Sequence, residues 1–251
     1  MSKTLLLMND FPDSPYGDVC YACNQPATTK EHAPPKGFFP QGRRRNLMTV
    51  PSCSIHNCDN ARDVEYVRNA IASLAGLNET GEFLFDTAKR SFGYSPALFR
   101  QTFQSFVVRS REEEVGTYRL DLKRVDAVMT AVVQALHYHD QHQKWGRWRV
   151  FVPSLRSESS LTHKGSDGFD AVRDLLSRIP YVDRPTAEPE VFMYGSHALD
   201  WGWIYRLAFY GGFLVNAWMV REDAESPAIE SGQGQAVDSS RPSRRRTQLV
   251  S

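Results

Sequence analysis

The sequence has no long apolar run and almost no net charge, and both absences narrow the class of protein. No stretch approaches the roughly twenty apolar residues that a membrane-spanning helix requires. The apolar patch at residues 5–8 is too short for the core of a signal peptide, and no small-residue cleavage site follows it. We therefore expect a cytoplasmic protein with no membrane partner. The formal net charge of +1 is uninformative about other partners.

Cysteine is also scarce, and its placement is uneven. The chain of 251 residues has four cysteines, Cys20, Cys23, Cys53 and Cys58, all in its first quarter. An exported protein stabilised by disulfides would distribute them over its core, whereas clustered pairs in a cytoplasmic chain indicate a metal site. A hydrophobic content of 41% with 12% aromatic residues is ordinary for a globular protein with a buried core.

Composition divides the chain into three regions and predicts the α+β class. Residues 1–76 hold the cysteines and end in an amphipathic helix, in which Val64, Val67 and Ile71 recur at helical spacing. Residues 77–222 are predicted to form a second domain of helices and antiparallel strands. Residues 223–251 lack apolar periodicity and contain several arginines, so we expect a disordered basic tail.

The second region carries the clearest secondary-structure signals. Apolar residues at helical spacing predict a long helix over residues 122–142, and a shorter one is expected over 167–179, before Pro180. Aromatic and β-branched residues predict the strands, which are residues 147–153, 190–195, 203–210 and 213–220. Gly211 and Gly212, between the last two strands, predict a two-residue hairpin turn.

The cysteine spacing predicts a structural zinc site. Cys20 and Cys23 are separated by two residues, which places two thiolates on one tight turn at an angle that tetrahedral zinc accepts. Cys53 is the third expected ligand. The fourth is His56, favoured because its two-residue gap from Cys53 matches the first pair, or Cys58, whose four-residue gap is also permitted.

The segment between these pairs resembles the HNH nuclease family. The resemblance covers about residues 18–68. It is carried by the motif residues Cys20, Cys23, Glu31-His32, Pro34, Asn46-Leu47, Cys53, His56 and Asn57. Members of that family fold as a ββα-metal finger, in many cases supported by a zinc knuckle. The expected fold is therefore an N-terminal ββα-metal finger with structural zinc, followed by a mixed helix and antiparallel-sheet domain.

The resemblance implies a role for each motif residue. His32 would be the general base, since an imidazole titrates near neutral pH, and Asn46 would orient the loop that carries it. Glu31 and Asn57, the latter expected at the start of a helix, would bind the catalytic metal. At the third position of the HNH motif this chain has Asn57 in place of histidine. The expected metal ligands are therefore mainly oxygen atoms, which favours Mg²⁺ or Mn²⁺. Asn60, one helical turn beyond Asn57, is an alternative ligand.

A basic run adds a nucleic-acid signal. Arg43, Arg44 and Arg45 lie between the motif residues, where they could contact the phosphates that flank the site of cleavage in a nucleic acid. The alternative interpretation is an ordinary solvated turn.

These patterns predict a metal-dependent HNH endonuclease that hydrolyses DNA, in a setting such as restriction or defence in a bacterium or phage. The region 77–222 would recognise DNA, a protein partner or a small ligand. One alternative is a non-catalytic zinc ribbon that binds nucleic acid or protein. Another is a toxin-like nuclease acting on RNA. A binding ribbon has no need of the Glu31-His32 pair with Asn57, which favours the enzyme.

Overall fold

A computed structural model describes residues 19–58, 61–73, 78–102, 106–108, 116–118, 120–144, 147–152 and 174–220. The expected basic tail and the first part of the helix expected over 167–179 lie outside these residues, as do Asn60 and the predicted domain boundary near residue 76. Within the described part, no helix is both long enough and apolar enough to cross a bilayer.

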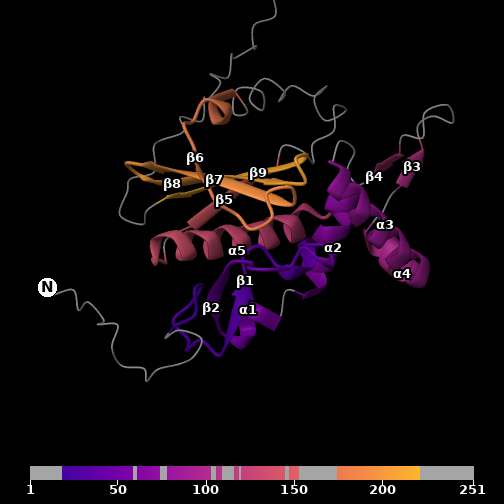
Figure 1. Ribbon diagram of the computed structural model, residues 1–251, viewed down its shortest axis with the longest axis horizontal. Helices are drawn as coiled ribbons and strands as arrows, with labels where there is room; N and C mark the ends of the chain where they lie inside the picture. The colour runs from indigo at the N-terminus through magenta and orange to yellow at the C-terminus, as the bar shows by residue number, and fades with distance from the viewer. Residues whose placement is uncertain are drawn as a thin grey trace, which may run out of the picture.

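The fold is mixed α+β with antiparallel sheets, as the composition predicts (Figure 1). The N-terminal elements are β1 (Thr29–His32), the 3₁₀ turn η1 (Lys36–Phe38), β2 (Thr49–Ser52), α1 (Ser54–Cys58) and α2 (Ala61–Ala72). The middle elements are α3 (Glu79–Tyr94), α4 (Pro96–Thr102), β3 (Phe106–Val108), β4 (Gly116–Tyr118) and α5 (Leu122–Gln141). The last elements are β5 (Arg147–Phe151), β6 (Val182–Arg184), β7 (Phe192–Leu199), β8 (Gly202–Phe209) and β9 (Phe213–Val220).

Helix α5 is the central element, and it matches the long helix predicted from periodicity. The Asp121 side chain accepts a hydrogen bond from the Lys123 backbone N–H and so caps its start. His142 ends it in a left-handed conformation, with φ of 53°. One apolar stripe of the helix is buried, including Val128, Met129 and Val132.

Helix α5 lies between two sheets (Figure 1). On one side is the five-stranded antiparallel sheet, ordered β5-β9-β8-β7-β6, and on the other is the β1–β2 pair, which α5 contacts through β2. In β8, Tyr205, Leu207 and Phe209 alternate toward the core while Arg206 is exposed on the opposite face. Buried residues from all these layers form one hydrophobic cluster.

The hairpin between β8 and β9 differs from the prediction. Phe209 pairs with Phe213, so the turn has Tyr210, Gly211 and Gly212 rather than the two glycines alone. Tyr210 adopts φ of 53° and Gly211 adopts φ of 70°, both in the left-handed region. The Tyr210 side chain is fully buried, and its packing outweighs the conformational preference that favours glycine at such a position.

Candidate functional site

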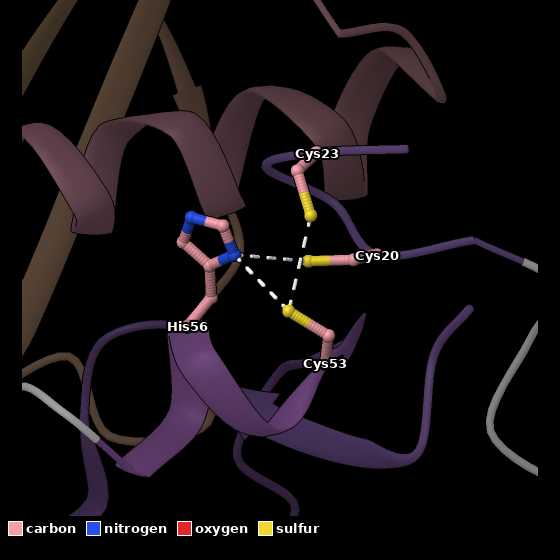
Figure 2. Close-up of side chains that lie close together, drawn as sticks. All are labelled: Cys20, Cys23, Cys53 and His56. Carbon is pink, nitrogen blue, oxygen red and sulfur yellow. Dashed lines mark hydrogen bonds between the residues drawn. The ribbon is translucent and has the colours of Figure 1, made fainter. Parts of the chain in front are cut away.

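Four side chains from two chain segments converge beside β2 (Figure 2). They are Cys20, Cys23, Cys53 and His56, whose candidate ligand atoms all lie within 4.8 Å of one another. The Sγ atoms of Cys23 and Cys53 are 3.8 Å apart. The His56 Nδ1 lies 3.2 Å from the Cys53 Sγ and 3.6 Å from the Cys20 Sγ. The three cysteines form no disulfide.

These separations are close to those of a tetrahedral zinc site, with the distance between the Cys53 Sγ and the His56 Nδ1 somewhat shorter. Zinc–sulfur bonds of about 2.3 Å and zinc–nitrogen bonds of about 2.0 Å at tetrahedral angles put ligand atoms roughly 3.5–3.8 Å apart. The group could therefore hold a metal ion such as zinc. The structure places His56, the ligand favoured by matched spacing, in this group. The side chain of Cys58 lies outside the described part, so that alternative remains a prediction.

Backbone hydrogen bonds position the first cysteine turn. The Cys20 N–H donates to the Gln25 carbonyl at 2.9 Å, which closes the turn, and the Tyr21 N–H donates to the Pro51 carbonyl at 2.8 Å, which fixes it to β2. Burial acts to raise the pKa of the Cys20 thiol, but backbone N–H groups, first among them that of Ala22, outweigh it and lower the pKa. Burial raises the pKa of Cys23.

A cavity of about 210 Å³ adjoins this Cys₃His group. Its lining includes Glu31 and His32 from β1, and His56 and Asn57 from α1. Three of the predicted catalytic and metal-binding residues, Glu31, His32 and Asn57, therefore share one cavity. The opposite wall is formed by α5, through Val128, Ala131, Val132 and Ala135.

The two adjacent β1 residues have shifted pKa values. Burial raises the pKa of Glu31 to about 7, although a hydrogen bond from the His32 backbone N–H opposes the shift. Burial, and then the positive charge of Lys36, lower the pKa of His32. The neutral imidazole, which can accept a proton, is therefore the dominant form of His32 at neutral pH.

Asn57 is tied to β1 through its amide nitrogen. Its Nδ2 donates to the Thr29 Oγ1 at 2.8 Å and lies 3.5 Å from the Lys30 carbonyl oxygen. The residue was expected at the start of a helix, but α1 begins at Ser54, so Asn57 lies near its end. This placement still brings it to the cavity, because α1 is a single short turn packed on β1.

Asn46 is placed away from that cavity. It is exposed in the loop before β2 and adopts φ of 52°, a left-handed conformation that asparagine tolerates. Among the described residues, its side chain has no hydrogen bond to the segment that carries His32. Its expected role in orienting that segment remains a prediction.

The three arginines differ in their surroundings. Arg43 forms ion pairs with Glu188 at 3.1 Å and with Glu190 at 2.6 Å, so the C-terminal half of the chain compensates its charge. The Arg44 Nε donates to the neutral Phe39 carbonyl at 2.8 Å, and Arg44 has no ion pair with any described residue. Arg45 is exposed. Their predicted contact with phosphates remains a prediction.

Sequence reasoning missed Lys36 and the contribution of α5. Lys36 lines the cavity and is the basic group whose charge acts on His32. A lysine four residues after His32, just beyond two prolines, is a signal that could have identified it. The α5 wall gave no such signal, because its alanines and valines match an ordinary core stripe.

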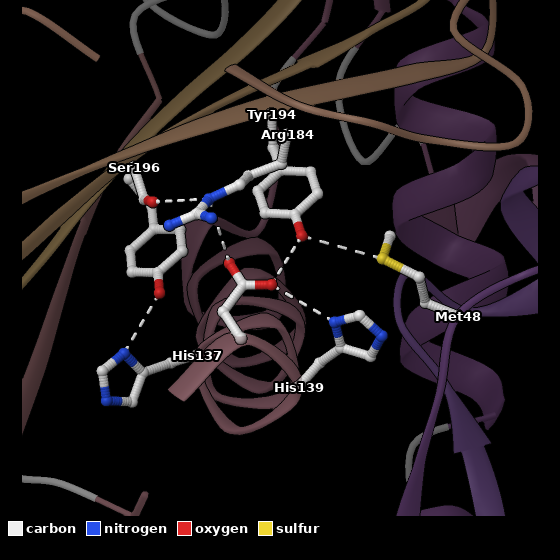
Figure 3. A network of polar contacts seen from close by, with 8 residues as sticks. Met48, His137, His139, Arg184, Tyr194 and Ser196 are labelled. Atoms are coloured by element: carbon white, nitrogen blue, oxygen red, sulfur yellow. Dashed lines mark hydrogen bonds and ion pairs between the residues drawn. The ribbon is translucent and has the colours of Figure 1, made fainter. Parts of the chain in front are cut away.

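A network of polar side chains joins α5 to the five-stranded sheet (Figure 3). The Tyr194 hydroxyl donates to Asp140 at 2.9 Å and lies 3.7 Å from the Met48 sulfur, next to β2. Asp140 also pairs with His139 at 3.2 Å and with Arg184 at 3.8 Å. The network thus connects the five-stranded sheet, α5 and the loop before β2.

Comparison of the chain with protein-family models, with curated proteins and with solved structures finds no match.

Proposed function

We propose that the protein is a metal-dependent endonuclease of the HNH type that hydrolyses DNA phosphodiester bonds. The observation that carries the proposal is the shared cavity of Glu31, His32 and Asn57 beside a Cys₃His group. The order β1, β2, α1 is also that of the ββα finger which the motif resemblance implies. Glu31 and Asn57 supply the oxygen donors that Mg²⁺ or Mn²⁺ prefers, so the donor set fits a catalytic metal.

The side chains then have distinct tasks. His32 takes a proton from water, the resulting hydroxide attacks phosphorus, and the bond to the 3′ oxygen breaks. The departing 3′ oxygen takes a proton from solvent water, which leaves 3′-hydroxyl and 5′-phosphate ends. A bound divalent metal would supply charge neutralisation at the phosphate and at the departing oxygen. Lys36 adds a positive charge at the same cavity. The Cys₃His group would hold the zinc that keeps β2 and α1 together with the first turn.

The test is a nicking assay on supercoiled plasmid with the full-length protein. We expect cutting with Mg²⁺ or Mn²⁺, none after EDTA, and recovery when Mg²⁺ is restored. His32→Ala should lower the rate by about 10²- to 10⁴-fold, the usual contribution of a general base. His197→Ala, a histidine on β7 that does not line the cavity, is the matched control.

Three results would overturn the proposal or one of its parts. If supercoiled DNA stays intact under every metal condition, the remaining hypothesis is the non-catalytic zinc ribbon. A gel-shift assay would then test whether the protein binds nucleic acid. Equal cutting by His32→Ala and wild type would remove His32 as the base. Cutting of RNA but not DNA would assign the same site to the ribonuclease alternative. Circular dichroism before and after EDTA shows whether a loss of cutting is accompanied by a loss of the fold.

A further inference from the structure

A second, larger cavity of about 740 Å³ lies on another face of the N-terminal motif. One wall is the segment of residues 37–44, which follows the β1 strand, and the other is α3, with Arg68 of α2 between them. We call this cavity the basic groove. Its size lies in the range of sites that enclose a ligand of several hundred daltons.

The lining of the basic groove carries an excess of positive charge. Five basic side chains line it against a single carboxylate, that of Asp86; they are Arg43, Arg44, Arg68, Lys89 and Arg90. Two of the five are compensated, since Arg43 pairs with Glu188 and Glu190 and Arg68 pairs with Glu65.

Among the residues that the structure describes, three cations of the groove have no charged partner. Arg44 bonds a backbone carbonyl and Arg90 lies 3.4 Å from the Thr87 hydroxyl, and both of these partners are neutral. Within the described part of the chain, Lys89 has no ion pair. An anionic ligand would therefore find unneutralised charge here.

An exposed aromatic ring lies among these charges. Phe83 lines the groove and is 68% exposed, although phenylalanine usually buries most of its surface. A positively charged groove with an exposed aromatic side chain is the arrangement that binds single-stranded nucleic acid. The phosphates follow the charges, and a base stacks on the ring.

The basic groove and the cavity of Glu31, His32 and Asn57 are neighbours. Lys36 lines that cavity and the next residue, Gly37, lines the groove. Val64 and Arg68, one turn apart on α2, likewise line one each. A Cβ atom at Gly37 would lie 3.5 Å from the Val64 side chain, so these two residues adjoin each other where the two sites meet, and we call the pair the Gly37–Val64 ridge.

We propose that the basic groove binds one strand of nucleic acid and leads it over the Gly37–Val64 ridge to the cavity of Glu31, His32 and Asn57. The path of the strand toward the cavity of Glu31, His32 and Asn57 rests on the proposed function. Binding of the strand in the basic groove does not depend on it. An acidic peptide could satisfy the charges but has no flat base to stack on Phe83. A duplex keeps its bases stacked within the helix, so Phe83 would contribute nothing to it.

The experiment measures binding of the zinc-loaded full-length protein to a fluorescein-labelled twelve-nucleotide oligothymidylate by anisotropy, with EDTA absent and Ca²⁺ in place of Mg²⁺. Phe83→Ala should weaken binding by between about fivefold and 150-fold, the range measured for stacking of one base. Phe85→Ala is its matched control, because Phe85 is an exposed ring on the same helix outside the groove, and we expect unchanged affinity.

Charge is tested by a double reversal. Lys89→Glu with Arg90→Glu should weaken binding and lower the slope of log Kd against log salt by about 0.7 for each phosphate that the protein no longer neutralises. Lys123→Glu with Arg149→Glu changes the net charge equally at exposed positions outside the groove and should leave the slope unchanged. Thermal unfolding of each variant shows that its fold is intact.

Three results would overturn the inference: equal affinity of the groove variants and their controls, competition by polyglutamate as strong as by the oligonucleotide, and duplex binding that is tighter and insensitive to Phe83→Ala. Failure of the groove is distinguishable from failure of the nuclease. His32→Ala should bind the oligonucleotide normally, and the groove variants should hydrolyse the small diester bis(p-nitrophenyl) phosphate at the wild-type rate.

Discussion

The Tyr210 hydroxyl donates a hydrogen bond to the backbone carbonyl of Phe38, and both residues are fully buried. They are 172 positions apart in the chain. The ring of Phe38 also packs edge-on against Phe209 at 5.5 Å between centroids. The β8–β9 hairpin therefore holds η1, the short turn from which Lys36 reaches one cavity and Gly37 the other.

Removing that hydroxyl should destabilise the fold. Tyr210→Phe leaves a buried carbonyl without this donor, which costs about 1–3 kcal/mol of the free energy of unfolding. Tyr181→Phe is the control: its hydroxyl is 3.5 Å from the Asn216 Oδ1, a long contact, and its loss should cost less. Urea unfolding followed by tryptophan fluorescence measures both, and equal losses would contradict the importance of the Phe38 bond.

The Cys₃His group allows a test of which residue is the fourth zinc ligand. His56→Ala removes one member of a group whose spacing already suits tetrahedral zinc, so we expect the purified variant to contain well under one equivalent of zinc. Cys58→Ser should retain one equivalent. Elemental analysis by mass spectrometry after dialysis measures both. If His56→Ala retains zinc and Cys58→Ser loses it, the fourth zinc ligand is Cys58 and not His56.

Much of the Cys₃His group could be predicted, because its four residues lie in two short segments with fixed spacing. Cys20, Cys23, Cys53 and His56 converge as that spacing requires. Periodicity likewise predicted α5 and most strands of the large sheet. Both signals are local, since they depend on residues a few positions apart.

The rest depends on contacts between distant parts of the chain. Arg43 belongs to a basic run, yet its partner Glu188 is 145 positions away, so its charge could be interpreted only from the structure. Tyr210 occupies a left-handed turn position that favours glycine, because its side chain is buried against η1. Local propensity cannot foresee either outcome, since tertiary packing decides both.

Thr29 should set the orientation of Asn57. Thr29→Val removes the hydroxyl that accepts the 2.8 Å hydrogen bond from the Asn57 amide, while the side-chain shape is kept. If Asn57 binds the catalytic metal, the single-turnover cleavage rate should fall by up to about a hundredfold, because small misplacements in an active site are costly. Thr29→Ser keeps an acceptor and should cleave nearly as wild type. Equal cleavage rates for the valine and serine variants would mean that the Thr29 hydroxyl does not orient Asn57 for catalysis.

His137 should make the stability of the fold depend on pH. Burial lowers its pKa to about 4, against an ordinary value of 6.5, while the nearby charge of Asp140 partly opposes the shift. The unfolded chain therefore binds a proton at this residue between about pH 6.5 and 4 and the folded chain does not. Its contribution is complete above pH 6.5 and is lost as the pH falls toward 4.

The size of this loss follows from the pKa difference. At about 1.36 kcal/mol for each pKa unit, it is on the order of 3 kcal/mol for a side chain that is only 1% exposed. The Tyr205 hydroxyl, 3.1 Å from the His137 Nδ1, can bond a glutamine amide instead, so His137→Gln removes the titration and keeps a polar partner. Urea unfolding at pH 7.5 and pH 4.5 should show a smaller acid loss in His137→Gln than in wild type or in the control His197→Gln. Parallel losses in all three proteins would mean that the acid sensitivity arises from other groups.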